Sequence, residues 1–384
     1  MHETGIEGYY AIRDGKKLYY GYTTGTCAAA AAKAAALMLA TGQAVPYVDI
    51  LTPKGIALNL EVLEPARAER HARCAIKKYS GDDPDVTDGV LVYADVTLEE
   101  APGVVVDGGE GVGRVTKPGL NQPVGAAAIN ATPRKMIAEQ VRAACERCGY
   151  TGGMEIVISV PGGEALARRT FNPRLGIEGG LSILGTTGIV EPMSAAALAD
   201  TVALELDVLR ASGASGVLLC PGNYGERFAR DALGLSMDGQ VTTGNLIGEA
   251  VQAAAAKGFE AILLVGHIGK LVKLGIGMRN THSRCGDGRM ETLVACALSA
   301  GAQTGLLRQL LDCATTDAAL DALDAAGLLR PTMDALGERI SRTLERWADG
   351  RAQIGFICFT NAPARTGVLA QSANAGALAE RWHI

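Results

Sequence analysis

Short apolar runs separated by polar turn residues fill the first half of the chain and predict more strands than helices there. The expected strands are residues 48–51, 56–63, 74–77, 90–98, 104–106 and 156–160. The first two flank Pro53-Lys54-Gly55, which favours a turn between them. This half is therefore expected to be a strand-rich α+β domain.

Two helices are expected within this half, and residues typical of helix ends mark both. The alanine-rich run Cys27–Ala40 follows Thr26 as its N-cap and precedes Gly42, which suits the position just after a helix. The second helix should begin with Thr132 as its N-cap and end near Gly149.

From residue 194 onward, helical and strand-like segments alternate along the chain. The expected strands are residues 217–220, 261–265 and 354–359. The expected helices are residues 194–210, 226–233, 247–257, 289–300, 304–311 and 333–348. Such alternation is typical of a parallel sheet covered by helices. We therefore expect residues 1–190 to form the α+β domain and residues 191–384 to form a Rossmann-like α/β domain with a mainly parallel sheet.

Composition and charge narrow the class of ligand. The net charge of −5 provides no positive field for nucleic acid or for an anionic membrane. The apolar run 27–40 is interrupted by Lys33 and is too short to span a bilayer. Nine scattered cysteines are expected to be reduced thiols, and no spacing typical of a metal site accompanies them. These features indicate a cytoplasmic protein that acts on a small molecule.

Two segments of the first half are candidates for ligand binding. Thr23, Thr24 and Thr26 lie at a helix start, where unpaired N–H groups and the helix dipole favour a carboxylate or phosphate. From these residues alone, an ordinary cap before a close-packed alanine helix is the stronger interpretation. In the long irregular run 161–192, Arg168 could pair with a substrate carboxylate, and Thr186-Thr187 could line a pocket.

A glycine-rich segment after the strand 104–106 is a candidate cofactor loop. Asp107, Gly109, Gly111 and Gly113 match the acidic-x-Gly-x-Gly-x-Gly pattern of many turns that bind S-adenosylmethionine. Two prolines follow and disfavour the helix that a Rossmann-type turn needs. A purely structural glycine loop therefore remains an alternative.

In the second half, two strands end in glycine-containing loops, which is where open α/β sheets bind ligands. The first loop contains Gly222 and Asn223, and the second contains His267 and Lys270. The second loop lacks the spacing of a phosphate-binding P-loop, so phosphoryl transfer is a weaker hypothesis. His282 lies in a polar loop shortly downstream, and either histidine could move a proton.

Seven of these motifs occur in order between about residues 22 and 291 and together resemble the CbiD family. They are GYTTGTCAAAAAKAAA, SGDDPDVTDG, GGEGVGRVTKPGL, PGGEALARRTFNPRLGIEGGLSILGTTGIVEPMS, PGNYG, GHIGKLVKLGIGM and THSRCGDGRME. The resemblance implies methylation of cobalt-precorrin-5B at ring carbon C1 in anaerobic cobalamin synthesis, with S-adenosylmethionine as the methyl donor. Cobalt would arrive in the substrate, and no metal bound by the protein itself is expected.

The chemistry and position of the candidate residues suggest hypothetical roles for them in this reaction. His267 and His282 are expected to be catalytic, and Thr23, Thr24, Thr26, Arg168, Thr186, Thr187 and Lys270 to bind the substrate. The expected cofactor-binding residues are Asp107, Gly109, Gly111, Gly113, Gly222 and Asn223. The corrin intermediate is the expected partner, together with a homo-oligomer and transient contacts with neighbouring pathway enzymes. The alternative from another class is a non-catalytic carrier of a corrin intermediate, which needs no adenosylmethionine site.

Overall fold

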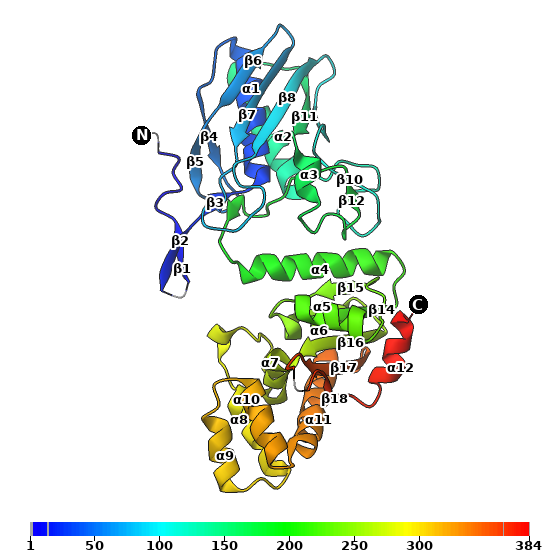
Figure 1. The fold of residues 1–384 in the computed structure, drawn as a ribbon. Coiled ribbons are helices and arrows are strands. Elements are labelled where there is room, and N and C mark those ends of the chain that lie inside the picture. The colour runs from blue at the N-terminus through cyan, green and yellow to red at the C-terminus, as the bar shows by residue number, and fades with distance from the viewer. Residues whose placement is uncertain (1–2, 14, 364, 384) are drawn as a thin grey trace. The chain divides into compact units, whose positions relative to one another are not determined.

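The computed structural model describes residues 3–13, 15–363 and 365–383. The chain forms two compact units, Met1–Ser194 and Ala195–Ile384, called unit 1 and unit 2 below. Each has its own hydrophobic core. Figure 1 shows the elements of each unit in chain order.

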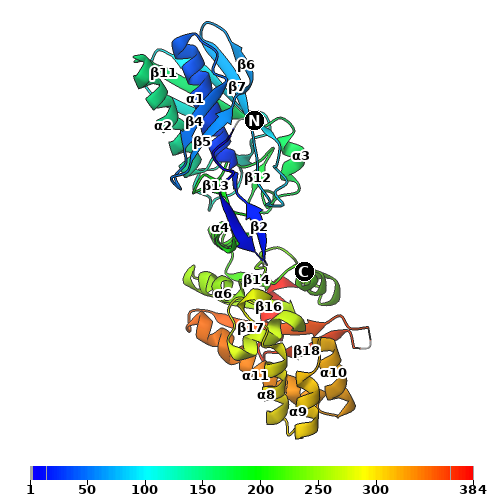
Figure 2. The same cartoon turned by 90° about the vertical axis from the view of Figure 1, so that its left-hand side faces the viewer.

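Unit 1 is built on a five-stranded sheet in the order β6-β7-β8-β11-β9. These strands are β6 (Leu63–Arg67), β7 (His71–Lys77), β8 (Leu91–Glu99), β9 (Val104–Gly108) and β11 (Gly153–Ser159). All neighbours are antiparallel except β9 and β11, which are parallel. Helices α1 (Thr24–Thr41) and α2 (Ala131–Cys148) pack against each other, α1 against β7 and β8 and α2 against β9 (Figure 2).

Helix α1 lies at the centre of unit 1, and its alanines allow neighbouring elements to approach closely. It has the length and composition of a helix that could cross a membrane, but 78% of it is buried inside the structure. It ends at Gly42, as expected. The expected N-cap, Thr26, is wrong: Thr23 caps the helix, because its hydroxyl accepts the backbone N–H of Thr26 and its own backbone is extended.

The remaining elements of unit 1 are short and mostly at its periphery. They are β1 (Tyr10–Arg13), β2 (Lys16–Tyr19), β3 (Gly21–Tyr22), β4 (Tyr47–Leu51), β5 (Ala57–Glu61), β10 (Arg114–Val115), α3 (Gly163–Ala167), β12 (Ile177–Glu178) and β13 (Ile189–Val190). β4 pairs with β5, which confirms the hairpin expected around Pro53. Antiparallel pairing of β3 with β13 brings the long run 161–192 to the start of α1.

Unit 2 contains a second five-stranded sheet in the order β15-β14-β16-β17-β18. These strands are β14 (Gly216–Cys220), β15 (Gln240–Thr242), β16 (Ala261–His267), β17 (Gln353–Thr360) and β18 (Gly367–Gln371). The first four strands in the sheet order are parallel and β18 is antiparallel at the edge, so the expected mainly parallel sheet is confirmed.

Helices cover this sheet and extend the unit beyond it. They are α4 (Ala195–Ala211), α5 (Asn223–Arg227), α6 (Ile247–Ala256), α7 (Ile268–Leu271), α8 (Arg289–Ser299), α9 (Thr304–Leu311), α10 (Thr316–Ala325), α11 (Leu329–Ala348) and α12 (Ala375–Ala379). A π-helical turn, Phe228–Ala232, continues α5, and short 3₁₀ turns follow at Val272–Ile276, Ser283–Cys285 and Glu380–Trp382.

Several boundaries differ from the sequence expectation for identifiable reasons. Helix α2 begins at Ala131 with Asn130 as its N-cap, so the expected cap Thr132 is wrong and lies inside the first turn. A proline in that turn is tolerated because the first N–H groups of a helix have no partner within the helix. The expected helix 226–233 begins earlier, at Asn223, and changes to a π-helical turn at Phe228.

Candidate functional site

The threonine-rich start of α1 is buried. Thr23, Thr24 and Thr26 are 5%, 3% and 0% exposed. The Thr26 hydroxyl donates to the carbonyl of Gly188 at 2.7 Å, and the Thr24 hydroxyl accepts the backbone N–H of Leu184 at 3.0 Å. Residues 182–188, the covering loop, therefore occupy the positions that an anion would take at this helix end.

Substrate binding by these three threonines remains a prediction, and it requires the covering loop to move. The covering loop also accepts the N–H groups of Thr23 and Gly25 through its carbonyl oxygens. The N–H groups and hydroxyls that were expected to hold a carboxylate therefore already have partners within unit 1. An anion could reach them only after the covering loop moved away.

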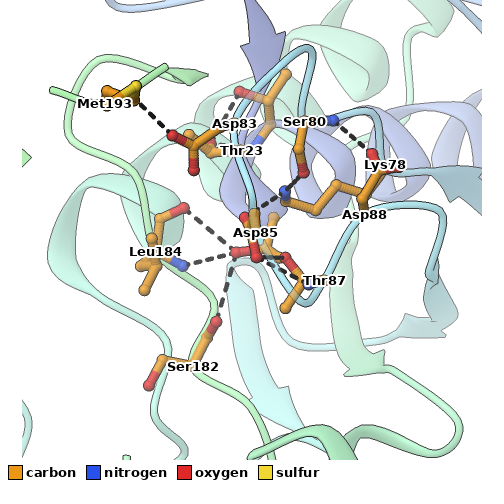
Figure 3. Close-up of polar contacts among 12 residues, drawn as sticks. Thr23, Lys78, Ser80, Asp83, Asp85, Thr87, Asp88, Ser182, Leu184 and Met193 are labelled. Atoms are coloured by element: carbon orange, nitrogen blue, oxygen red, sulfur yellow. Dashed lines mark hydrogen bonds and ion pairs between the residues drawn. The ribbon is translucent and has the colours of Figure 1, made fainter. Parts of the chain in front are cut away.

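A network of charged and polar groups lies next to this helix start and involves the acidic loop, residues 78–89 (Figure 3). The side chain of Lys78 is 2% exposed, and its ammonium pairs with Asp85 at 2.7 Å and donates to the Ser80 hydroxyl. Asp85 also accepts the backbone N–H and hydroxyl of Thr87, at 2.8 and 2.7 Å. Asp88 accepts the backbone N–H of Ser80 at 2.7 Å.

The carboxylates of the acidic loop join separate segments of unit 1. Asp82 accepts the backbone N–H of Tyr19 at 2.6 Å, and Asp83 accepts that of Met193 at 2.9 Å. Burial alone would raise the pKa of Asp85, but Lys78 and the hydrogen bonds from Lys78 and Thr87 lower it overall. Among the described residues, no group of three or more His, Cys, Asp or Glu side chains could hold a metal ion. The acidic loop therefore holds separate segments of unit 1 together.

The glycine-rich segment after β9 has a packing explanation. Gly111 has φ +71°, and a Cβ atom there would overlap the carbonyl oxygen of Val160. A Cβ atom at Gly113 would come within 2.8 Å of the Gly180 carbonyl oxygen. Asp107 forms an ion pair with Arg114, at 2.8 Å, which lowers its pKa. Cofactor binding by this segment stays a prediction, although neighbouring backbone fills the space beside its glycines.

The other substrate-binding candidates of unit 1 lie at its surface. Arg168 pairs with Glu164 one turn away at 3.3 Å, and both side chains are largely exposed. Thr186 and Thr187 are exposed, and the Thr187 hydroxyl donates to the carbonyl of Ile189 at 3.1 Å. The structure does not bring Arg168 into contact with either threonine among the described residues.

In unit 2, the loops after β14 and β16 meet as the sequence predicts. They enclose a cavity of about 180 Å³, called the strand-end crevice, lined by Pro221, Tyr224, Gly225, Gly266, His267, Gly269 and Lys270. The ammonium of Lys270 donates to the carbonyl oxygens of Pro221 at 2.7 Å and Gly244 at 3.1 Å. Burial lowers the pKa of Lys270. Gly222 has φ +111°, and a Cβ atom there would meet the Lys270 ammonium at 3.9 Å.

His267 ends β16 and caps the short helix α7. Its Nδ1 accepts the backbone N–H of Gly269 at 3.1 Å, so the neutral ring carries its proton on Nε2. Burial lowers its pKa, and the nearby Asp317 partly opposes that shift. The ring packs edge-on against Phe359 at 5.6 Å between centroids and lies 6.2 Å from the ring of Tyr224.

His282 lies in a separate loop that approaches the same region through backbone contacts. Its Nδ1 accepts the backbone N–H of Arg284 at 3.1 Å. The neighbouring Thr281 donates its backbone N–H to the carbonyl of Asn245, the residue after the Gly244 that Lys270 contacts. The two histidine-containing segments therefore meet the same loop after β15, but among the described residues the two rings make no hydrogen bond or ring contact with each other.

Sequence reasoning missed three residues that the structure makes prominent. Lys78 gave no signal because its burial and its pairing with Asp85 arise only once the acidic loop folds back. Tyr224 lies within the PGNYG motif, but its 67% exposure could not be read from the sequence. Thr243 follows β15, and its buried hydroxyl has no hydrogen-bond partner among the described residues.

A larger cavity, of about 790 Å³, lies between α11 and β18. None of the predicted site residues lines it.

Comparison with known proteins identifies the family. A family model described as CbiD matches residues 11–192, and one described as CbiD, C-terminal domain, matches residues 280–373. A relative from Edwardsiella ictaluri, named cobalt-precorrin-5B C(1)-methyltransferase, is 47% identical over 86% of this chain and 87% of its own length. A relative of the same name from Alkaliphilus metalliredigens is 44% identical over 97% of both chains.

One solved structure is also similar. It is the crystal structure of a cobalamin biosynthesis protein (cbiD) from Archaeoglobus fulgidus, 29% identical, with a TM-score of 0.39 over 73% of this chain and 87% of that chain. The two family models and the near full-length relatives agree with the ordered motifs of the sequence. This chain belongs to the CbiD family.

Proposed function

We propose that this protein methylates cobalt-precorrin-5B at C1 to give cobalt-precorrin-6A, with S-adenosylmethionine as the methyl donor. The observation that carries the proposal is identity of 44% over 97% of both chains to a relative named for that reaction. A match of this extent includes both units rather than one shared domain. The ordered motifs, which span about residues 22–291, add independent support.

The protein contributes to such a transfer mainly by holding the methyl donor and the macrocycle in position. The donor supplies an electrophilic methyl group and leaves as S-adenosylhomocysteine. Holding two reactants in reacting geometry can supply on the order of 7–11 kcal/mol of the barrier. The residues at the strand ends of unit 2 suit this task because a rigid parallel sheet fixes them.

The chain's own groups fit the donor better in unit 2 than at the glycine-rich segment of unit 1. In the strand-end crevice, the ammonium of Lys270 has three N–H groups and donates two hydrogen bonds within the protein. By contrast, backbone atoms occupy the space beside Gly111. We propose that Gly222 and Asn223, in the loop beside Lys270, bind the donor and that unit 2 is Rossmann-like.

His267 is proposed to donate a hydrogen bond rather than to act as a base. Because Nδ1 accepts the Gly269 N–H, the neutral ring presents Nε2–H to a ligand. Burial lowers its pKa and so keeps the ring neutral near pH 7. The ring can thus donate a hydrogen bond from Nε2 to a reactant. His282 is the second candidate for this role.

Binding of the macrocycle is proposed for the exposed positive and hydroxyl groups of unit 1. Arg168, Thr186 and Thr187 are accessible, whereas Thr23, Thr24 and Thr26 require displacement of the covering loop. Cobalt is proposed to arrive within the substrate. We further propose a cytoplasmic location, a homo-oligomer and transient contacts with neighbouring pathway enzymes, since the substrate is a pathway intermediate.

The direct test is calorimetry followed by single-turnover methyl transfer. The purified protein is titrated with S-adenosylmethionine and S-adenosylhomocysteine, with and without corrin substrate, and then assayed for transfer of labelled methyl to the macrocycle. Binding of the donor and formation of singly methylated product are expected. Corrin binding without affinity for either sulfur compound would instead indicate a non-catalytic carrier.

A further inference from the structure

Tyr224 is an exposed aromatic residue at the edge of a cavity. It lies in the first turn of α5, and 67% of its surface is exposed, more than for any other tyrosine among the exposed large side chains. It nevertheless lines the strand-end crevice, and its ring lies 6.2 Å from that of His267 at 42°. A ring held at a cavity edge with a free face is available to a ligand.

Two chemically different groups line the crevice. Lys270 provides a positive charge, and the neighbouring Gly222 carries no side chain to cover the ammonium. Tyr224 provides an aromatic ring. The residues that line the crevice, Pro221, Tyr224, Gly225, Gly266, His267, Gly269 and Lys270, include no carboxylate. A cation held here must therefore be stabilised by an aromatic face or by carbonyl oxygens.

The size of the crevice limits what it can hold. Its volume of about 180 Å³ lies below the roughly 300–1,000 Å³ typical of pockets for whole small-molecule ligands. A tetrapyrrole macrocycle is far too large to enter. One end of a smaller ligand fits, and the adjoining loops can contact the remainder.

We propose that the strand-end crevice holds the methionine part of the methyl donor, with the Lys270 ammonium on its carboxylate and the face of Tyr224 against its sulfonium. The proposal rests on the proposed methyltransferase function and reassigns Lys270 from the macrocycle to the donor. It gives Tyr224 a positioning role that the motifs did not suggest. An aromatic face attracts a cation through the ring quadrupole.

The lining complements two of the donor's three charges. Its carboxylate and its sulfonium lie a few bonds apart, so a cationic and an aromatic group in one small cavity complement them, and carbonyl oxygens are left to accept from its α-ammonium. S-adenosylhomocysteine has the same carboxylate but a neutral thioether. Recognition by Tyr224 should therefore favour the donor over the product, which helps the product to leave.

The test compares donor and product binding in matched variants. Calorimetry on the full chain measures affinity for S-adenosylmethionine, for S-adenosylhomocysteine and for sinefungin, a cationic analogue. Tyr224→Ala is expected to weaken binding of the two cationic ligands by about 3- to 30-fold and to change product binding less than about twofold. Tyr224→Phe should retain the preference, because the ring is kept. Tyr9→Ala, a substitution at a 44% exposed tyrosine in unit 1, is the control and should change none of these affinities.

Lys270→Met tests the cationic group that lines the crevice. It is expected to weaken donor and product binding equally, because both carry the carboxylate. Equal losses for donor and product in Tyr224→Ala would overturn the sulfonium assignment and place the ring on a part common to both. Unchanged affinities in Tyr224→Ala would overturn it as well. Failure of the unaltered protein to bind either compound would instead contradict the proposed function.

Discussion

The polar network of unit 1 and the strand-end crevice of unit 2 contain similar residue types but use them differently. In unit 1, Lys78 and the carboxylates of the acidic loop are paired with each other or with backbone N–H groups. In unit 2, His267 and Lys270 line a cavity. The charged groups of the acidic loop thus hold unit 1 together, whereas those at the strand ends of unit 2 face a space that a ligand could enter.

The largest expected effect concerns the imidazole of His267. His267→Asn keeps an acceptor for the Gly269 N–H but removes the Nε2–H that we assign to hydrogen-bond donation. Single-turnover methyl transfer should fall by about 10²- to 10³-fold. Unfolding followed by tryptophan fluorescence should change little, and both tryptophans, Trp347 and Trp382, lie in unit 2.

The same substitution at His282 provides the matched comparison. It also keeps a cap acceptor, for the backbone N–H of Arg284. Full activity of His267→Asn together with a large loss in His282→Asn would move the hydrogen-bond donor role to the second histidine. Full activity in both variants would remove both histidines from the reaction.

The second prediction concerns the ion pair between Lys78 and Asp85 in unit 1. Asp85→Asn leaves the ammonium of Lys78 buried without a carboxylate and should lower the free energy of unfolding by about 3–5 kcal/mol. The double variant Lys78→Met/Asp85→Asn removes both charges and should recover part of that loss. Calorimetric melting measures both, and the affected transition should leave tryptophan fluorescence unchanged. Wild-type stability of Asp85→Asn would show that the pair does not hold the acidic loop.

The third prediction separates packing from cofactor binding at the glycine-rich segment. Gly111→Ala places a Cβ atom against the Val160 carbonyl at a positive φ, which should cost about 1–3 kcal/mol of stability or more. Affinity of the folded variant for S-adenosylmethionine should remain that of the unaltered protein. A large loss of donor affinity without a loss of stability would return the cofactor role to this segment.

The smallest expected effect is a pH dependence of unit 2. Burial lowers the pKa of His267, so the unfolded chain binds this proton more readily as the pH falls below about 6.5. The free energy of unfolding should therefore fall between pH 6.5 and 5.5, by up to about 1 kcal/mol from this group, and should stay constant above pH 7. Urea midpoints from tryptophan fluorescence should show this slope reduced in His267→Asn. Identical slopes in the two proteins would contradict the assigned shift.

Several elements of this structure could be predicted because residues close together in the sequence determine them. The hairpin around Pro53, the end of α1 at Gly42 and the parallel strands of unit 2 follow from turn residues, capping glycine and apolar runs. The cap of α1 was misplaced by three residues because both threonines suit a cap. The choice of Thr23 depends on Gly188, more than 160 residues away, which accepts the Thr23 N–H and the Thr26 hydroxyl proton.

The candidate site was predictable in part for the same reason. Strand ends followed by glycine loops placed His267 and Lys270 together, and the structure brings both into one cavity. The burial of Thr24 and the exposure of Tyr224 depend on which distant segments cover them. The edge strand β18 was missed because its short segment has no clear alternation, and helix α10 was missed although Thr315 caps it.

The central claim is that the donor binds at the strand ends of unit 2 rather than at the glycine-rich segment of unit 1. Hydrogen exchange with and without S-adenosylhomocysteine tests it residue by residue on the full chain. The account predicts slower exchange in residues 221–227 and 266–271 and no change in residues 107–113. Slower exchange confined to residues 107–113 would contradict it.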